Sequence, residues 1–334
     1  MPRIPRTGIV CSLLLAVIGA PASASSADLL LLLGQETDGT VPAPPPAGDA
    51  DRGVSFEYTA SFGYVHEFDT DLSGGGSAGV DRGFAAFKIG IDPGGDLDGS
   101  VGVAWGGDWY RFKGTSDLSP APDTGPWTDI QAMAILGRLS WQIDRAWSTT
   151  IGLDLRFAGE TDADAADSMT LGGFGAISYA FSPTLSLGGG AILSSQIEDS
   201  ILVIPALIVY WQVTDTVVVS NVLGPEVYPT GAGLEVAWRP DRLREVAIGT
   251  RYESRRFRLN DDGPAIRRNG VGEDTGYPLW ARATWRFENG FRLDLVGGIS
   301  LFNSYRLDDA NGNEIAKTDL DPAPFVGIFG SWHF

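Results

Sequence analysis

The chain has 334 residues, of which 42 are acidic and 24 are basic, for a formal net charge of −18. Such an acidic chain is a poor match for the phosphates of a nucleic acid, so we expect no nucleic-acid partner. Its 44 glycines and 10 tryptophans, set against 3 methionines, are typical of an all-β chain with many turns.

The first 24 residues have the three parts of a secretory signal peptide. Arg3 and Arg6 supply the positive start, and residues 8–20 form an apolar stretch that is too short to span a bilayer. An A-x-A cleavage pattern ends the segment. The alternative is a membrane anchor or a buried helix. We predict that residues 1–24 are removed together with Cys11, the single cysteine, which would exclude disulfides and thiolate chemistry.

The next segment, residues 25–53, has no β or helical period. Its apolar run "ADLLLLL" (27–33) is compatible with a short periplasmic helix, a plug or a poorly ordered tail. Residues 34–53 contain a proline cluster, which predicts a flexible linker.

From Val54 onward, apolar residues alternate with polar or small ones. The stretches "TTIGLDLRF" (149–157) and "LWARATWRF" (279–287) show this period of two, which indicates β-strands. No segment carries a helical stripe, and no apolar run approaches the ~18 residues of a transmembrane helix. The whole of residues 54–334 is therefore predicted to be all-β.

Six short connections alternate with seven long or polar ones, so fourteen strands are predicted. The predicted strands are 54–66, 82–91, 99–112, 128–143, 147–157, 169–181, 185–194, 201–213, 216–223, 231–238, 245–258, 277–288, 290–305 and 320–334. The predicted long connections are 67–80, 113–127, 158–168, 195–200, 224–230, 259–276 and 306–319. The region from 195 to 238 is the least regular, because "ILVIPALIVYW" is apolar on both faces and Pro205 and Pro229 interrupt it.

Short turns at one end and long loops at the other are the layout of bacterial outer-membrane barrels. Aromatic residues fit the same layout, because two girdles are expected where such a barrel meets the two membrane interfaces. Near the short turns lie Trp141, Trp147, Trp211, Trp238, Trp285 and Trp332. Near the long loops lie Trp109, Trp127, Tyr252, Tyr277, Trp280 and Tyr305. A soluble β-sandwich would instead bury its tryptophans in one core.

The last ten residues, "FVGIFGSWHF", alternate apolar side chains up to a final Phe334. This strand resembles the assembly signal of bacterial outer-membrane β-barrel proteins, with Trp332 and Phe334 as the signal residues. Pro205 and the stretch "VVVSNVLGPEVYPTGAGLEVAWRP" are also similar to an uncharacterised porin-like group of such barrels, which implies no particular activity.

The resemblance implies a transmembrane antiparallel up-and-down β-barrel of about fourteen strands over residues 54–334, in the outer membrane of a Gram-negative-type bacterium. Its last strand would pair with its first, because an open edge is intolerable in lipid. The implied partners are outer-membrane lipid, lipopolysaccharide and the barrel assembly machinery. The oligomeric state stays open.

A barrel of fourteen strands should enclose a lumen unless a loop or the N-terminal segment plugs it. Charged residues on the inward parity are candidates for the wall of a pore. They are Arg138, Arg156, Arg251, Glu253, Arg255, Arg282, Arg286, Arg292 and Asp294, with Glu57, Lys88, Asp154 and Glu235 on the same parity. One interpretation is a selective wall, electropositive near 251–292; the other is a network of cross-strand ion pairs.

Other chemistry has little support. Acidic loops such as "DADAAD" (162–167) are compatible with Ca²⁺ or lipopolysaccharide contacts, but simple solvated loops are favoured and no metal or cofactor is predicted. His66, near Asp69 and Asp71, lies on the lipid-facing parity, and His333 lies at the periplasmic rim. We therefore predict a channel or porin-like transporter for small polar solutes and no enzyme. The alternatives are a structural or adhesive surface barrel with a plugged lumen and, less favoured, an outer-membrane hydrolase.

Overall fold

The computed structural model describes residues 53–114, 117–118, 125–221, 232–262 and 267–334. The predicted signal peptide, the leucine run, nearly all of the linker and the predicted loop 224–230 lie outside the described residues. Within the described part of the chain, no helix is long and apolar enough to cross a bilayer.

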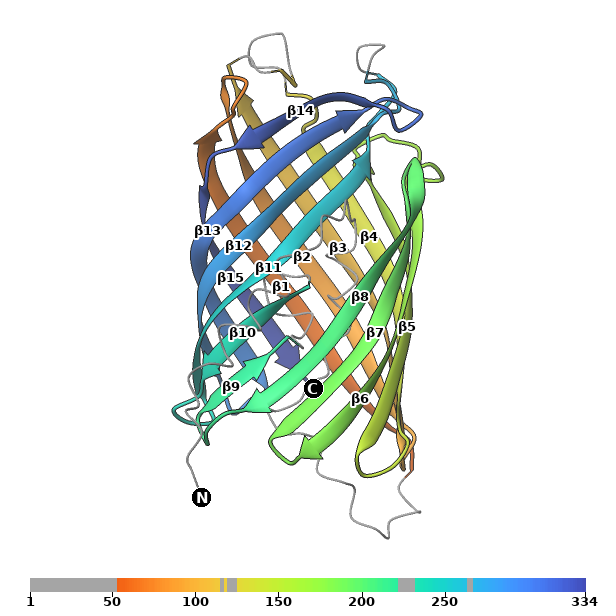
Figure 1. The fold of residues 1–334 in the computed structure, drawn as a ribbon, viewed down its shortest axis with the longest axis vertical. Coiled ribbons are helices and arrows are strands. Elements are labelled where there is room, and N and C mark those ends of the chain that lie inside the picture. The colour runs from red at the N-terminus through yellow and green to blue at the C-terminus, as the bar shows by residue number, and fades with distance from the viewer. Residues whose placement is uncertain (1–52, 115–116, 119–124, 222–231, 263–266) are drawn as a thin grey trace, which may run out of the picture.

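The described residues form strands throughout (Figure 1). Their bounds are β1 Ser55–Asp71, β2 Ser77–Asp92, β3 Leu97–Lys113, β4 Asp129–Gln142, β5 Trp147–Glu160, β6 Met169–Ser182, β7 Leu185–Gln196, β8 Asp199–Gln212, β9 Val217–Ser220, β10 Ala232–Trp238, β11 Arg244–Arg258, β12 Val271–Arg286, β13 Phe291–Asp308, β14 Glu314–Leu320 and β15 Ala323–His333.

The strands pair antiparallel in chain order, and the sheet closes on itself. β15 pairs with β13 on one side and with β1 on the other, in a register that runs from Thr59 opposite His333 to Glu67 opposite Phe325. β14 pairs with the outer end of β13 and continues into β15 after Asp321 and Pro322, so the two are one interrupted strand. In the described part of the chain the wall is a closed barrel of 14 strands, which confirms the predicted fold class and the pairing of the last strand with the first.

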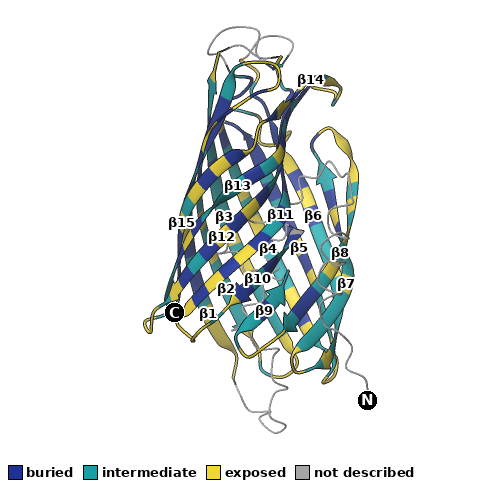
Figure 2. Ribbon diagram, turned by 60° about the vertical axis from the view of Figure 1, so that its left-hand side comes forward, coloured by how far each residue is buried: buried dark blue, intermediate teal, exposed yellow. Residues whose placement is uncertain are grey.

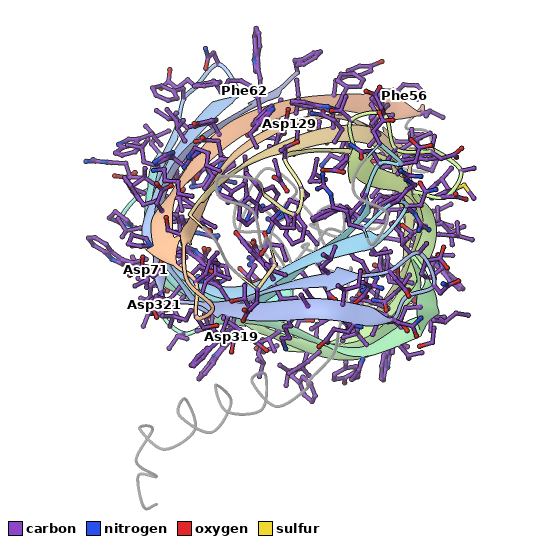
Figure 3. All side chains as sticks on the ribbon, turned by 90° about the horizontal axis from the view of Figure 1, so that it is seen from above. Phe56, Phe62, Asp71, Asp129, Asp319 and Asp321 are labelled. Atoms are coloured by element: carbon purple, nitrogen blue, oxygen red, sulfur yellow. The ribbon has the colours of Figure 1, made fainter. Side chains whose placement is uncertain are left out.

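Alternation along each strand separates an outer apolar face from an inner polar one. In β11 the side chain of Ile248 is 60% exposed, whereas Arg251 and Glu253 are buried. The same pattern appears as bands of alternating burial in Figure 2. Viewed along the barrel, Phe56 and Phe62 of β1 point away from it (Figure 3). In water such a face would be unstable; in lipid it is the favourable arrangement.

Five of the six tryptophans predicted beside the short turns are exposed on the outer face, namely Trp141, Trp147, Trp238, Trp285 and Trp332. The sixth, Trp211, is half-buried. Half of the opposite girdle was wrongly predicted. Trp127, Trp280 and Tyr305 are almost completely buried. Trp280 shares the inward parity of Arg282, and Trp127 and Tyr305 pack together inside the outer mouth. Nearness to a loop in the sequence does not specify which side of the wall a ring faces.

Several predicted long loops are short turns on longer strands. β1 continues to Asp71 and β2 begins at Ser77, so the predicted connection 67–80 is mostly strand. The predicted connections 195–200, 259–276 and 306–319 are likewise shortened by β7, β8, β12, β13 and β14. These strand ends carry polar residues because they project past the lipid, where backbone pairing continues without an apolar outer face.

The wall changes between β8 and β11. β9 pairs with only Tyr210–Gln212 of β8, and β10 pairs with the lower half of β11. At its outer end β11 contacts β5 directly, with Arg258 opposite Gly159. Pro205 lies on the part of β8 that, within the described residues, pairs with β7 alone. Because proline has no N–H to donate, it fits such an edge.

Candidate functional site: the interior of the barrel

Five aromatic rings fill the outer mouth of the lumen, and we call them the mouth cluster: Tyr110, Phe112, Trp127, Phe257 and Tyr305. They come from β3, the segment before β4, β11 and β13, which lie on different sides of the barrel. The ring centroid of Trp127 lies 5.2 Å from that of Phe257 and 5.6 Å from that of Tyr305, both edge to face. Rings in this geometry attract one another beyond their simple burial.

Apolar residues surround the mouth cluster. Leu72, Leu259, Leu307 and Leu320 are all buried in the same core. Trp127 has no measurable exposure to solvent. The mouth cluster is therefore a buried apolar core at the end of the barrel that carries the long loops.

A belt of charged side chains lies directly beneath the mouth cluster. Arg82 pairs with Asp108 at 3.0 Å and with Asp274 at 2.8 Å. The hydroxyl of Tyr110 donates to the same Asp274 at 2.8 Å, which joins the belt to the mouth cluster. Arg255 pairs with Glu253 at 3.0 Å and approaches Asp108 at 3.6 Å. The belt thus alternates cations and carboxylates.

A cavity of about 120 Å³ lies beside this belt. Small side chains form one side of it, on β1, β3, β4 and β5: Gly63, Ala104, Gly106, Ala132, Ala134 and Ala158. Val65, Phe84 and Phe329 add apolar surface, and Arg82, Asp108, Arg156 and Arg255 form the polar side. The cavity exists because consecutive strands place small residues inward at the same height.

The half of the lumen beside the short turns contains a second charged network, centred on Arg282, which we call the short-turn network. Its guanidinium pairs with Glu235 at 2.5 Å, with Glu245 at 2.8 Å and with Asp294 at 3.1 Å. Around it, Arg286 pairs with Glu245 at 3.1 Å and Arg292 pairs with Asp294 at 2.9 Å. The indole of Trp280 donates to Glu235 at 3.0 Å. Arg282, Glu245 and Asp294 are almost completely buried.

The nine predicted wall residues all lie on the inward parity, but they do not form one surface. Arg282, Arg286, Arg292 and Asp294 belong to the short-turn network, and Glu253 and Arg255 belong to the belt. Arg156 borders the cavity. Arg251 lies over the ring of Trp280, 4.8 Å from its centroid, and Arg138 pairs with Asp98 at 2.8 Å. Whether any of them borders a conducting path stays a prediction.

Two parts of this interior, the charged belt and the mouth cluster, were not identified from the sequence. Asp274 was assigned to a loop, and Arg82 and Asp108 were not among the candidates although both have the inward parity. The mouth cluster was missed because its rings are far apart in the sequence. The alternation along the strand does predict an inward position for Tyr110, because Tyr110 has the same parity as Asp108.

The two histidines lie apart from these groups. His66 is on the outer parity, with its Nδ1 2.7 Å from a carboxylate oxygen of Asp81. The Nδ1 of His333 is 3.1 Å from the hydroxyl of Thr59, at the other end of β1. Among the residues with a described position, no group of three or more histidine, cysteine, aspartate or glutamate side chains could hold a metal ion.

No protein-family model and no curated protein matches this chain. Several solved structures have a similar fold. An outer-membrane channel of the COG4313 group from Pseudomonas putida F1 is 11% identical, with a TM-score of 0.46 over 87% of this chain and 99% of that one. The toluene transporter TodX of P. putida is 10% identical, with a TM-score of 0.42 over 94% of this chain and 95% of that one.

The KdgM porin in complex with oligogalacturonate is 7% identical, with a TM-score of 0.31 over 80% of this chain and 97% of that one. Similarities at this level concern the barrel alone and say nothing of a solute. In the described part of the chain the fold is a closed up-and-down β-barrel of 14 antiparallel strands with an apolar outer face.

Proposed function

We propose that this protein is an outer-membrane channel for small solutes, held closed at its outer mouth by the mouth cluster. The observation that carries the proposal is the cavity inside the barrel, immediately below that cluster. A barrel with a plugged lumen would have its interior filled by loops or side chains, whereas a channel needs space inside the wall. Here inward residues such as Ala104, Gly106 and Ala132 leave space instead.

The charges of the wall support selection by size and shape rather than by net charge. Arg82, Arg255 and Arg282 each lie within ion-pair distance of at least two carboxylates. Pairing of this kind cancels much of the electropositive field that unpaired arginines would produce. Passage of small polar solutes, which the sequence predicted, remains part of the proposal and is tested below.

The proposal includes a location in the outer membrane, with lipid and lipopolysaccharide around the barrel and insertion by the barrel assembly machinery. Its support is the exposed apolar outer face and the girdle of Trp141, Trp147, Trp238, Trp285 and Trp332. The proposed role needs no catalytic group and no cofactor.

Solute flux into proteoliposomes tests the proposal. Swelling should be slow but measurable for the wild type with the smallest uncharged solutes, and faster for Trp127→Ala, which removes the central ring of the mouth cluster. Trp141→Ala is the matched control, because it removes the same side chain from the lipid-facing girdle; it should swell at the wild-type rate. Swelling of the wild type and of Trp127→Ala no faster than that of empty liposomes would refute the channel.

A barrel that acts through its surface is the second candidate, and the mouth cluster itself favours it. If these rings are only a structural core, Trp127→Ala should lower the stability of the barrel without changing flux. The hydrolase that the sequence left as a third possibility has no supporting observation beyond the contact of His66 with Asp81.

A further inference from the structure

The cavity beneath the mouth cluster has the size of a single small ring. Its volume is about 120 Å³, and an engineered apolar cavity of about 150 Å³ binds benzene. The space is only partly enclosed, and the side chains around it lack packing partners on the side that faces it.

The walls of the cavity favour an apolar occupant. Ala132, Ala158 and Phe84 present only carbon atoms, and Val65 and Phe329 close the side formed by β1 and β15. Gly106 faces the open space, because a Cβ built there would have no atom nearer than the carbonyl oxygen of Gly83, at 3.8 Å. Most of the lining is apolar, and the charged side chains Arg82, Asp108, Arg156 and Arg255 lie together on the other side.

The polar side of the cavity is already paired. Arg82 binds Asp108 and Asp274, and Arg255 binds Glu253. A charged solute would have to compete with these pairs, whereas an uncharged one leaves them intact. The Nε–H of Arg82 has no hydrogen-bond partner within the described residues, but it is fully buried and does not open onto the cavity.

We propose that this cavity is a binding site for an uncharged, mainly apolar molecule of about one six-membered ring. The inference rests on the proposed channel and adds an apolar solute to the small polar solutes named above. The apolar ring would pack against the alanine and phenylalanine side chains.

Benzene binding to the refolded barrel in detergent micelles tests the site. Micelles take up the same amount of benzene whichever variant they hold, so a difference between variants reports the barrel itself. Equilibrium dialysis should give about one more bound benzene per barrel for the wild type than for Gly106→Leu, whose side chain would occupy the cavity. Ala132→Leu, on the neighbouring strand, should lose the same benzene.

Gly175→Leu is the matched control, because Gly175 lies on the lipid-facing side of β6, where the nearest atom to a built Cβ is Cγ2 of Ile151 at 4.0 Å. It should bind benzene like the wild type. Heat-modifiable migration on gels checks that every variant is folded. Equal uptake by the wild type, Gly106→Leu and Gly175→Leu would overturn the site.

A further probe tests the chemical class. Benzoate should bind at least tenfold more weakly than benzene, and tighter binding of benzoate would overturn the assignment to uncharged molecules. Benzene binding without solute flux would refute the proposed channel but support the binding site. Solute flux with equal benzene uptake in all variants would support the channel but refute the binding site.

Discussion

Removing the guanidinium of Arg282 should destabilise the barrel more than any change at an exposed arginine. Arg282 holds Glu235, Glu245 and Asp294 together at 2.5–3.1 Å, and its side chain is almost completely buried. The change Arg282→Met keeps much of the side-chain volume but leaves the three carboxylates with fewer counter-charges. Breaking a buried pair from one side costs about 3–5 kcal/mol, and we expect a loss of that size in the free energy of unfolding.

Urea unfolding of the barrel in lipid vesicles, followed by tryptophan fluorescence, measures this loss. Arg244→Met is the control, since Arg244 is largely exposed and its ion pair within the described residues is with Asp241 in a turn. This change should alter the free energy of unfolding by less than about 0.5 kcal/mol. The double change Arg282→Met with Glu235→Gln should cost less than the sum of the two single changes, because it removes one stranded charge. A loss below about 1 kcal/mol for Arg282→Met would show that water screens the network, and the account of a buried charge would be wrong.

Three other outcomes are expected. Deleting Phe334, or changing Trp332 and Phe334 together to Asp, should block insertion into the membrane. The ring of Phe334 stacks on that of Tyr58, 5.7 Å away, where the barrel closes, and the side chains of Trp332 and Phe334 are exposed on the outer face. Normal yields of heat-modifiable barrel would contradict this. If the lumen conducts, the double change Arg251→Ala with Arg255→Ala should move the reversal potential in a KCl gradient toward cation selectivity. The shift should be clearer at high salt, where the charges of the acidic loops are screened over a few ångströms. An unchanged reversal potential would leave both arginines with a structural role. In the β4–β5 turn, the backbone N–H groups of Ala146 and Trp147 donate to Asp144 and hold the pKa of its carboxyl below the usual range. The stability that these hydrogen bonds add is present above pH ~4 and is lost as the pH falls through the lowered pKa. On acidification, the urea midpoint of the wild type should therefore fall more than that of Asp144→Ala. An equal fall of the two midpoints would contradict this prediction.

The alternation of the strands was predictable from the sequence because lipid and lumen impose opposite demands on neighbouring residues. In β11 this placed Arg251, Glu253 and Arg255 inward and Ile248 outward, as the structure has them. The closing strand could be recognised because Val326, Ile328 and Trp332 share one face, and all three are exposed on the outside.

The interior could not be predicted to the same depth. A period of two specifies the face of Arg282, but its partners Glu235 and Glu245 depend on which strands are neighbours and in what register. The mouth cluster depends on contacts across the lumen, such as that of Trp127 with Phe257, which no local pattern encodes. The polar strand ends beyond the lipid were mistaken for loops because they lack the apolar outer face on which the prediction relied.

The channel itself is tested most directly by ionic current through single barrels in a planar bilayer, recorded for the wild type, Trp127→Ala and Trp141→Ala. The account predicts small, discrete openings for the wild type and for Trp141→Ala. Removal of the central ring of the mouth cluster in Trp127→Ala should make the openings larger or longer. A complete absence of openings in folded wild type and in Trp127→Ala would contradict it.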